Sequence, residues 1–221
     1  MNKKLFPVIH ISSSSQVKKD ISHAQEVGVD GVFLINHGLV SNNSFYNIIE
    51  SCIEFQTSLF PIGINFLGIE NEKALDLALK FGTKMLWVDN AGVDSQPEIA
   101  DKIYKQAIDK IKYFGGVQFK YQSDRGKKDI FDSIKSSLGI VEIPTLSGIG
   151  TGKAADLDFI KRAFSAANGM SLAIASGISV DNVDFFLPYI DYFLVATSIL
   201  DDSGYYLCPK KLKSLTNKIH T

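Results

Sequence analysis

Short apolar runs alternate with amphipathic stretches along the whole 221-residue chain. The amphipathic stretches repeat apolar residues every three or four positions, which places those residues on one side of a helix. The apolar runs are rich in Val, Ile and Phe and begin near Leu5, Gly31, Pro61, Met85, Gly116, Ile140, Ser171 and Tyr192. The helical sets include Val17, Ile21 and Ala24; Phe45, Ile48, Ile49 and Cys52; Ala74, Leu77, Ala78 and Phe81; Ile99, Ile103, Ala107 and Ile111; Ile130, Ile134 and Leu138; and Leu157, Ile160 and Phe164.

This alternation predicts a single compact α/β domain over residues 1–221. The predicted strands are apolar throughout, as in a parallel sheet that is covered on both faces. Glycines end the predicted helices at positions 28, 82, 115, 139 and 169. A short helix after Ser179 and a last helix over 209–219 complete eight strand–helix units, which favour a closed (β/α)8 TIM barrel. An open doubly wound sheet is the alternative, but the first strand lacks the Gly-rich turn of that fold.

Composition narrows the classes of partner. The net charge is −1, from 23 basic and 24 acidic residues, and no long block of like charge points to nucleic acid or an anionic membrane. No apolar run reaches the length of a membrane span. Cys52 and Cys208 do not have metal-ligand spacing. We therefore expect a cytoplasmic protein with no metal, no flavin or nicotinamide cofactor, and no nucleic-acid or membrane partner.

Polar residues at the predicted strand ends are the candidates for chemistry, because active sites of such barrels lie there. Asp89 follows four apolar residues, and Lys120 lies inside a predicted fifth strand, V-Q-F-K-Y-Q. Asp89 could act as general acid or base, and Lys120 could stabilise an oxyanion or form a Schiff base. His10 would be a second proton carrier. Equally, Asp89 and Lys120 could form a structural ion pair on neighbouring strands, and His10 could be a hydrogen-bonded core residue.

Two asparagines at strand ends, Asn36 and Asn65, are candidates for binding substrate, or else they tie loop backbones together. His37 precedes a glycine, and the sequence indicates a loop residue.

The last three predicted strands each end in small polar residues and glycine. Such clusters can direct backbone N–H groups at an anion. The Gly148 to Lys153 segment matches neither a Walker A loop nor a dinucleotide-binding turn, because its spacing differs from both. The sequence therefore predicts a phosphate site made by Ser147, Gly148, Thr151, Gly152, Ser176, Gly177, Thr197 and Ser198. The alternative is that these glycines only form tight turns.

These segments carry a resemblance to a known family. Thr151-Gly152-Lys153, Ser176-Gly177 with Asn182-Val183, and Pro61-Ile62-Gly63-Ile64-Asn65 resemble the BtpA/SgcQ family, and matching segments follow in order along nearly the whole chain. The resemblance implies a cytoplasmic, homo-oligomeric TIM barrel of the phosphate-binding type. That family is linked to photosystem I biogenesis in cyanobacteria and to sugar-operon proteins.

The chain departs from the family in three places. Ile35 stands where members usually have Glu, Asp89 where they have Asn, and Ser12 to Ser15 replace a Pro-rich loop. Catalysis that depends on a carboxylate at position 35 is therefore not implied for this chain.

Together these features predict an enzyme, a lyase, isomerase or transferase, that acts on a small phosphorylated metabolite such as a sugar phosphate or nucleotide. The alternative is a non-catalytic binding or assembly factor that keeps the barrel and its anion pocket.

Overall fold

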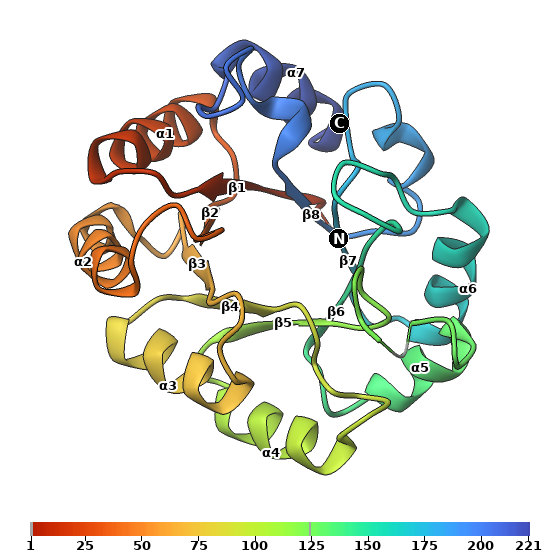
Figure 1. Cartoon of the computed structure of the whole chain (residues 1–221). Coiled ribbons are helices and arrows are strands. Elements are labelled where there is room, and N and C mark those ends of the chain that lie inside the picture. Colours follow the sequence, from red (N-terminus) through yellow and green to blue (C-terminus); the bar gives the residue numbers. More distant parts are fainter. Residues whose placement is uncertain (1, 124) are drawn as a thin grey trace.

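Eight parallel strands form a closed barrel, and each strand pairs with its neighbours in chain order (Figure 1). The computed structural model describes residues 2–123 and 125–221. The first and last strands pair with each other, with Leu5 opposite Phe193, and this confirms the predicted (β/α)8 barrel. The strands are β1 (Lys4–His10), β2 (Val32–Ile35), β3 (Ile62–Asn65), β4 (Met85–Val88), β5 (Lys112–Gly116), β6 (Ile143–Leu146), β7 (Ala173–Ala175) and β8 (Tyr192–Val195).

Helices surround the barrel as an outer ring (Figure 1). Ser13 and Ser41 accept hydrogen bonds from backbone N–H groups in the first turns of α1 and α2, and Asp129 and Asp156 do the same for α5 and α6. The helices are α1 (Ser14–Val27), α2 (Asn42–Cys52), α3 (Asn71–Phe81), α4 (Pro97–Ala107), α5 (Ile130–Ser137), α6 (Leu157–Ala167) and α7 (Pro209–Ile219). Short 3-10 turns are η1 (Ile53–Phe55), η2 (Val183–Phe185) and η3 (Thr197–Ile199).

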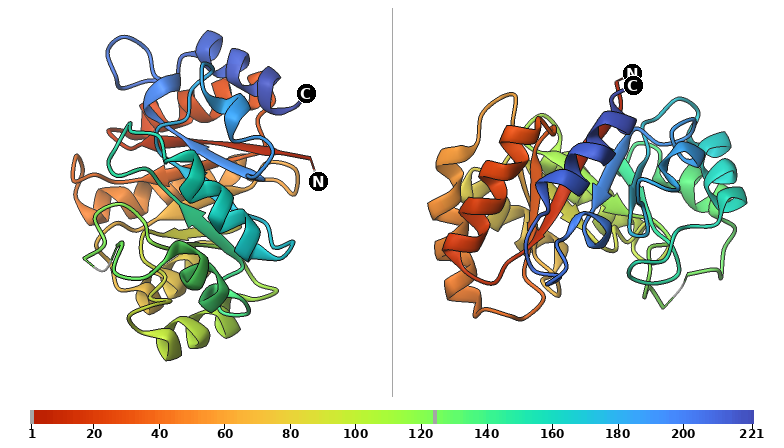
Figure 2. Two further views of the ribbon diagram at one scale, coloured as in Figure 1. Left: turned by 90° about the vertical axis from the view of Figure 1, so that its right-hand side faces the viewer. Right: turned by 90° about the horizontal axis from the view of Figure 1, so that it is seen from above.

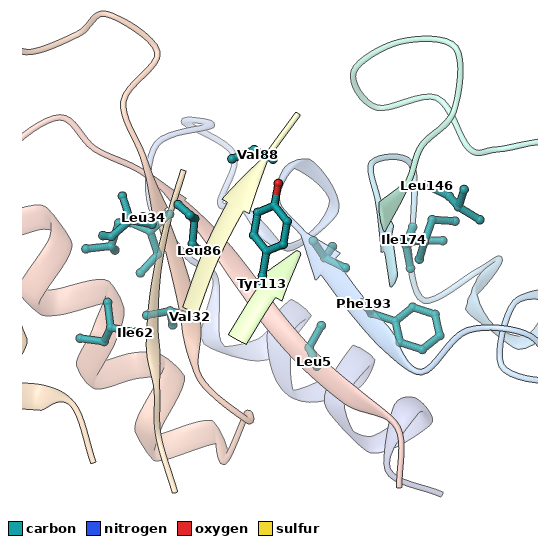
Figure 3. Close-up of a cluster of buried hydrophobic side chains, with 14 of the residues drawn as sticks. Leu5, Val32, Leu34, Ile62, Leu86, Val88, Tyr113, Leu146, Ile174 and Phe193 are labelled. Carbon is teal, nitrogen blue, oxygen red and sulfur yellow. The ribbon is translucent and has the colours of Figure 1, made fainter. Parts of the chain in front are cut away.

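Alternate residues of each strand point to different layers, as strand geometry requires. The outward set packs against the helices, and Figure 3 shows Leu34, Leu86, Ile174 and Phe193 among its members. The inward set fills the barrel and is rich in aromatic rings. Phe33 and Phe114 lie 5.2 Å apart between ring centroids in an edge-to-face arrangement. The barrel is therefore a packed core, not a pore.

The prediction for the fifth strand was wrong. This strand begins at Lys112, not Gly116, and α4 ends at Ala107, before Ile111. The pair Gly115-Gly116 looked like a helix stop, but it lies at the end of β5. A Cβ atom on Gly116 would lie 2.0 Å from the carbonyl oxygen of Asp89, so glycine lets β5 approach the chain after β4. Lys120 consequently lies in the loop after β5, not inside a strand.

Some helix predictions also need correction. Ile99, Leu138 and Phe164 were assigned to buried stripes, but 44%, 42% and 47% of these residues is exposed. They lie at the edges of the apolar faces of their helices, where the three-to-four-residue spacing does not decide whether a side chain is buried. The helix predicted after Ser179 is only the 3-10 turn η2, because Val183–Phe185 makes a single tight turn.

The two termini lie on the same face of the barrel, where the strands begin (Figure 2). Asp30, just before β2, joins them. Its carboxylate accepts hydrogen bonds from the Leu5 N–H at 2.9 Å and from Lys4 Nζ at 2.7 Å, and lies 2.8 Å from His220 Nε2. Glu142 and Asp191 accept from the Tyr113 and Leu172 N–H groups in the same way. These carboxylates satisfy strand-start amides and leave the opposite rim for chemistry.

Candidate functional site

A cavity of about 710 Å³ opens at the rim where the strands end. Its floor is the top of the barrel interior, where the inward side chains are Val8, Ile35, Trp87, Ala175 and Leu194. This size and this mixture of an apolar floor with a polar rim are typical of small-molecule sites.

One side of the cavity carries the titratable groups of His10, His37, Asp89 and Lys120, and the Tyr121 phenol also lines the cavity. The first three continue the inward alternation of their strands. His10 follows Phe6 and Val8, His37 follows Phe33 and Ile35, and Asp89 follows Met85 and Trp87. The imidazole rings of His10 and His37 lie 4.6 Å apart between centroids. His37, which the sequence indicated as a loop residue, therefore belongs to the same side of the cavity, and the period-two pattern could have found it.

Burial is the main influence on the protonation of this group. It lowers the pKa of His10 to about 4, with the positive charges of His37 and Lys120 acting in the same direction. Burial also lowers the pKa of His37 and of Lys120. It raises the pKa of the Asp89 carboxyl, although the hydrogen bond from Asn65 and the charge of Lys120 oppose this. The arrangement thus favours neutral imidazoles and brings an amine and a carboxyl closer to proton exchange near neutral pH.

The structure does not form the Asp89–Lys120 ion pair that the sequence offered as an alternative. Among the described residues, Asp89 accepts a hydrogen bond from Asn65 Nδ2 at 2.8 Å. Lys120 Nζ lies 3.4 Å from Thr151 Oγ1 and 5.5 Å from the centre of the Phe119 ring. The two groups share the cavity without neutralising each other at close range.

The side of the cavity formed by the loops after β6, β7 and β8 adjoins Lys120 at Thr151. It contains six of the eight residues predicted to bind phosphate: Thr151, Gly152, Ser176, Gly177, Thr197 and Ser198. No hydrogen bond of the described residues uses the backbone N–H of Gly177, Thr197 or Ser198. The Ser198 hydroxyl donates to the Ile178 carbonyl at 2.5 Å. This side therefore offers amide donors more than free hydroxyl groups.

Gly177 allows the glycine-rich loop to cross directly above β7. Its φ is 72°, and a Cβ atom there would lie 2.1 Å from the Ala154 nitrogen. The neighbouring Ser176 has a φ of 96°, a conformation that costs a non-glycine residue energy. The Ser176 hydroxyl donates to the Gly150 carbonyl at 3.0 Å and accepts from the Gly152 N–H at 3.2 Å. The two loops are thereby fixed together at the cavity edge.

Ser147 and Gly148, the other two predicted phosphate residues, do not line the cavity. Ser147 is fully buried, and its hydroxyl accepts from the Lys120 N–H at 2.7 Å. Arg125, which sequence reasoning missed, donates to the Ser147 carbonyl at 3.0 Å and to the Gly148 carbonyl at 2.9 Å. These residues brace the loops from beneath. No motif in the sequence marked Arg125, because its partners are backbone carbonyls of a distant loop.

The two asparagines also lie outside the cavity lining. Asn36 donates to the Val40 carbonyl at 2.8 Å and accepts from the Gly38 N–H at 3.0 Å, so its side chain closes a loop. Asn65 is buried and orients Asp89. Neither side chain is placed to contact a ligand in this cavity, which supports the loop-tying alternative for Asn36.

Within residues 2–123 and 125–221, no group of three or more His, Cys, Asp or Glu side chains could hold a metal ion. No helix in that part of the chain is long and apolar enough to cross a membrane.

Comparisons with known proteins agree with this architecture. The sequence model of the BtpA family matches residues 13–207. No match is found among proteins with curated functions. Phosphoribosyl anthranilate isomerase from Thermus thermophilus is similar in structure, with a TM-score of 0.71 and 14% identity over 98% of both chains. The 2-keto-3-deoxy-6-phospho-gluconate aldolase from Zymomonas mobilis gives 0.69 and 14%, over 100% of this chain and 93% of that one. At 14% sequence identity, these structural similarities establish a shared fold and nothing about a shared reaction.

Proposed function

Because the chain belongs to the BtpA family and has acid–base groups facing unpaired amides, we propose that it is an enzyme acting on a small phosphorylated metabolite, such as a sugar phosphate or nucleotide. One observation carries this proposal: a single cavity of about 710 Å³ is lined both by His10, Asp89 and Lys120 and by Gly177 and Thr197. A metabolite with a phosphate at one end would place its reacting carbons near the acid–base groups.

The amide side supports phosphate as the anchoring group. Successive backbone N–H groups in turns form concave anion sites, and many barrels bind phosphate through the loops after their last two strands. The strained φ of Ser176 fits this proposal, since such strain is retained where a loop must keep a special shape. The structurally similar isomerase and aldolase are both named for phosphorylated compounds. The cytoplasmic location and the homo-oligomer that the family resemblance implies stay predictions.

The binding part is tested by thermal and urea unfolding of the protein with sugar phosphates, nucleotides and the matching unphosphorylated compounds. A phosphorylated ligand at 100 times its Kd should add about 2.7 kcal/mol to the free energy of unfolding. Thr197→Val keeps the shape of the side chain and removes a hydroxyl that lines the cavity. We expect weaker binding for this variant, whereas Thr221→Val, at an exposed position outside the cavity lining, serves as the matched control. Equal stabilisation by phosphorylated and unphosphorylated compounds would contradict the proposal.

The catalytic part is tested on whichever phosphorylated compound stabilises the protein, with turnover followed by phosphorus NMR. Asp89→Asn and Lys120→Met should each lower the rate about 10²–10⁴-fold while the proteins stay folded, because a positioned proton carrier contributes an effect of that size. Binding without turnover by the unmutated protein would favour the non-catalytic binding factor. Unfolding of both variants would instead assign Asp89 and Lys120 a structural role.

A further inference from the structure

Lys120 differs from lysines that serve as ion-pair partners. Within the described part of the chain, its amine forms no salt bridge with a carboxylate, and it donates a hydrogen bond to the Thr151 hydroxyl at 3.4 Å. By contrast, Lys4, Lys128 and Lys218 each contact an aspartate. Lys120 is also the one lysine in the described lining of the cavity. Among the described residues, its amine therefore faces a ligand site without a carboxylate in ion-pair contact.

The backbone of Lys120 is held firmly although it lies in a loop. Its N–H donates to the buried Ser147 hydroxyl at 2.7 Å, and Arg125 Nη1 donates to the same hydroxyl at 3.2 Å. Gln122 donates to the Asp89 carbonyl at 2.8 Å and so joins this loop to the end of β4. The loop after β5 is thus braced on both sides. Such support is what a reacting side chain requires, because small displacements of reacting atoms are costly.

The surroundings also suit an amine that reacts in its neutral form. Burial lowers the pKa of Lys120, and only an uncharged amine is a nucleophile. Burial raises the pKa of Asp89, so this carboxyl can supply a proton in the same cavity. His10 lines the cavity as a neutral imidazole that can transfer a proton between two other atoms.

We propose that Lys120 captures the carbonyl carbon of a phosphorylated aldehyde or ketone as an imine. This inference rests on the proposed function and narrows its substrate class to carbonyl compounds. The inference excludes nucleotides as substrates of this step unless they carry an aldehyde or ketone group that the Lys120 amine can attack.

The step balances with groups in the cavity. The Nζ lone pair forms a bond to the carbonyl carbon, and the carbonyl π electrons move to oxygen. That oxygen takes one proton from the attacking nitrogen, relayed by His10, and a second from Asp89, which received it from the Lys120 ammonium before the attack. The C–O bond then breaks, water leaves, and nitrogen forms the C=N bond with one proton retained. Asp89 ends as a carboxylate beside the iminium.

Reductive trapping tests the inference. The protein is incubated at pH 7 with glyceraldehyde 3-phosphate and sodium cyanoborohydride, and the adduct is located by intact mass and peptide mapping. We expect modification at Lys120 at least about tenfold faster than at Lys153, because a phosphate bound in the cavity holds the carbonyl carbon near the Lys120 amine and raises its effective concentration there. Lys120→Arg should abolish that adduct, and Lys153→Arg, on the neighbouring loop, should leave it. Unphosphorylated glyceraldehyde should label Lys120 more slowly.

Glycerol 3-phosphate, which has no carbonyl, separates this inference from the proposed function. If it stabilises the protein but no selective adduct forms at Lys120, the imine inference is wrong and the phosphate site stands. Labelling spread over surface lysines, unchanged in Lys120→Arg, would also contradict the imine inference. If neither glycerol 3-phosphate nor the sugar phosphates and nucleotides stabilise the protein and Lys120 is not labelled, both proposals fail.

Discussion

His10 and His37 lie side by side at the barrel rim, where side chains from β1 and the end of β2 meet above an apolar floor. Two cationic imidazoles at this distance, with Lys120 nearby, would repel one another. Burial, together with the positive charge of Lys120, lowers the pKa of both His10 and His37, which favours the neutral imidazoles.

The lowered pKa of His10 predicts how stability depends on pH. Its value of about 4 in the folded protein is below its ordinary 6.5, so the unfolded chain takes up this proton first. The contribution of His10 to the free energy of unfolding is therefore constant above about pH 6.5. It falls progressively between about pH 6.5 and 4 and changes no further below about pH 4. His10→Gln should remove this loss. Urea unfolding at pH 7.5 and 4.5 should show a loss smaller by about 1–2 kcal/mol in the variant, allowing for partial solvent exposure.

The result would be informative in either direction. Asp89 has a raised pKa and acts in the opposite sense, since it stabilises the folded protein as it takes up a proton. The comparison of His10→Gln with the unmutated protein cancels that effect. An identical loss of stability in both proteins would mean that His10 is as well solvated as it is in the unfolded chain.

Single residues were predictable from the sequence where they continue a strand. His10 and Asp89 follow apolar runs directly, and both line the cavity. Asn36 also follows a strand, but it lies one position out of phase with Phe33 and Ile35, so its side chain turns into the loop. Arg125 could not be predicted, because its role depends on which distant loop packs over it.

At the scale of elements, Arg125 holds the glycine-rich loop between β6 and α6. Its guanidinium makes three hydrogen bonds to Ser147 and Gly148 and lies 5.4 Å from the centre of the Phe159 ring. Lysine cannot reproduce this fork of donors. Arg125→Lys should therefore lower the free energy of unfolding by about 1–3 kcal/mol and weaken phosphate binding, because buried carbonyls lose their donors.

Arg162→Lys is the matched control, since the exposed Arg162 pairs only with Asp129 on the surface. Exposed ion pairs contribute about 0–1 kcal/mol. Urea unfolding and phosphate titration of both variants make the comparison. If both substitutions change the free energy of unfolding and the phosphate affinity equally, the hydrogen bonds from Arg125 to Ser147 and Gly148 do not hold the loop in place.

The order of elements was well predicted, and their boundaries less so. Seven of the strands begin within three residues of the predicted position, because the start of an apolar run marks the start of a strand. The fifth was misplaced because glycine served close packing against Asp89 in place of ending a helix. From the sequence alone, a glycine can be interpreted either as the end of a helix or as a position of close packing. The contact with the chain after β4 decides between the two.

The whole molecule is held closed by contacts between its two ends. β1 pairs with β8, α7 packs against α1, and Asp30 contacts both Lys4 and His220. Eight repeated units predicted a barrel, but no local pattern could predict the register between the first and last strands. That register depends on strand tilt around the complete ring.

Closure by packing, without a covalent link, predicts that the chain tolerates circular permutation. A Gly/Ser linker would join residues 221 and 2, and new ends would lie between Ser58 and Leu59, where Leu59 is 88% exposed. We expect a folded barrel whose Tm falls by less than about 10 °C and whose phosphate affinity is retained.

A second permutant, opened between Ile149 and Gly150, should fold and bind phosphate more weakly, because the loop beside Ser176 is cut. An unfolded first permutant would mean that chain order, and not the β1–β8 contact, secures the barrel. Equal phosphate affinity in both would mean that the glycine-rich loop is not part of the phosphate site.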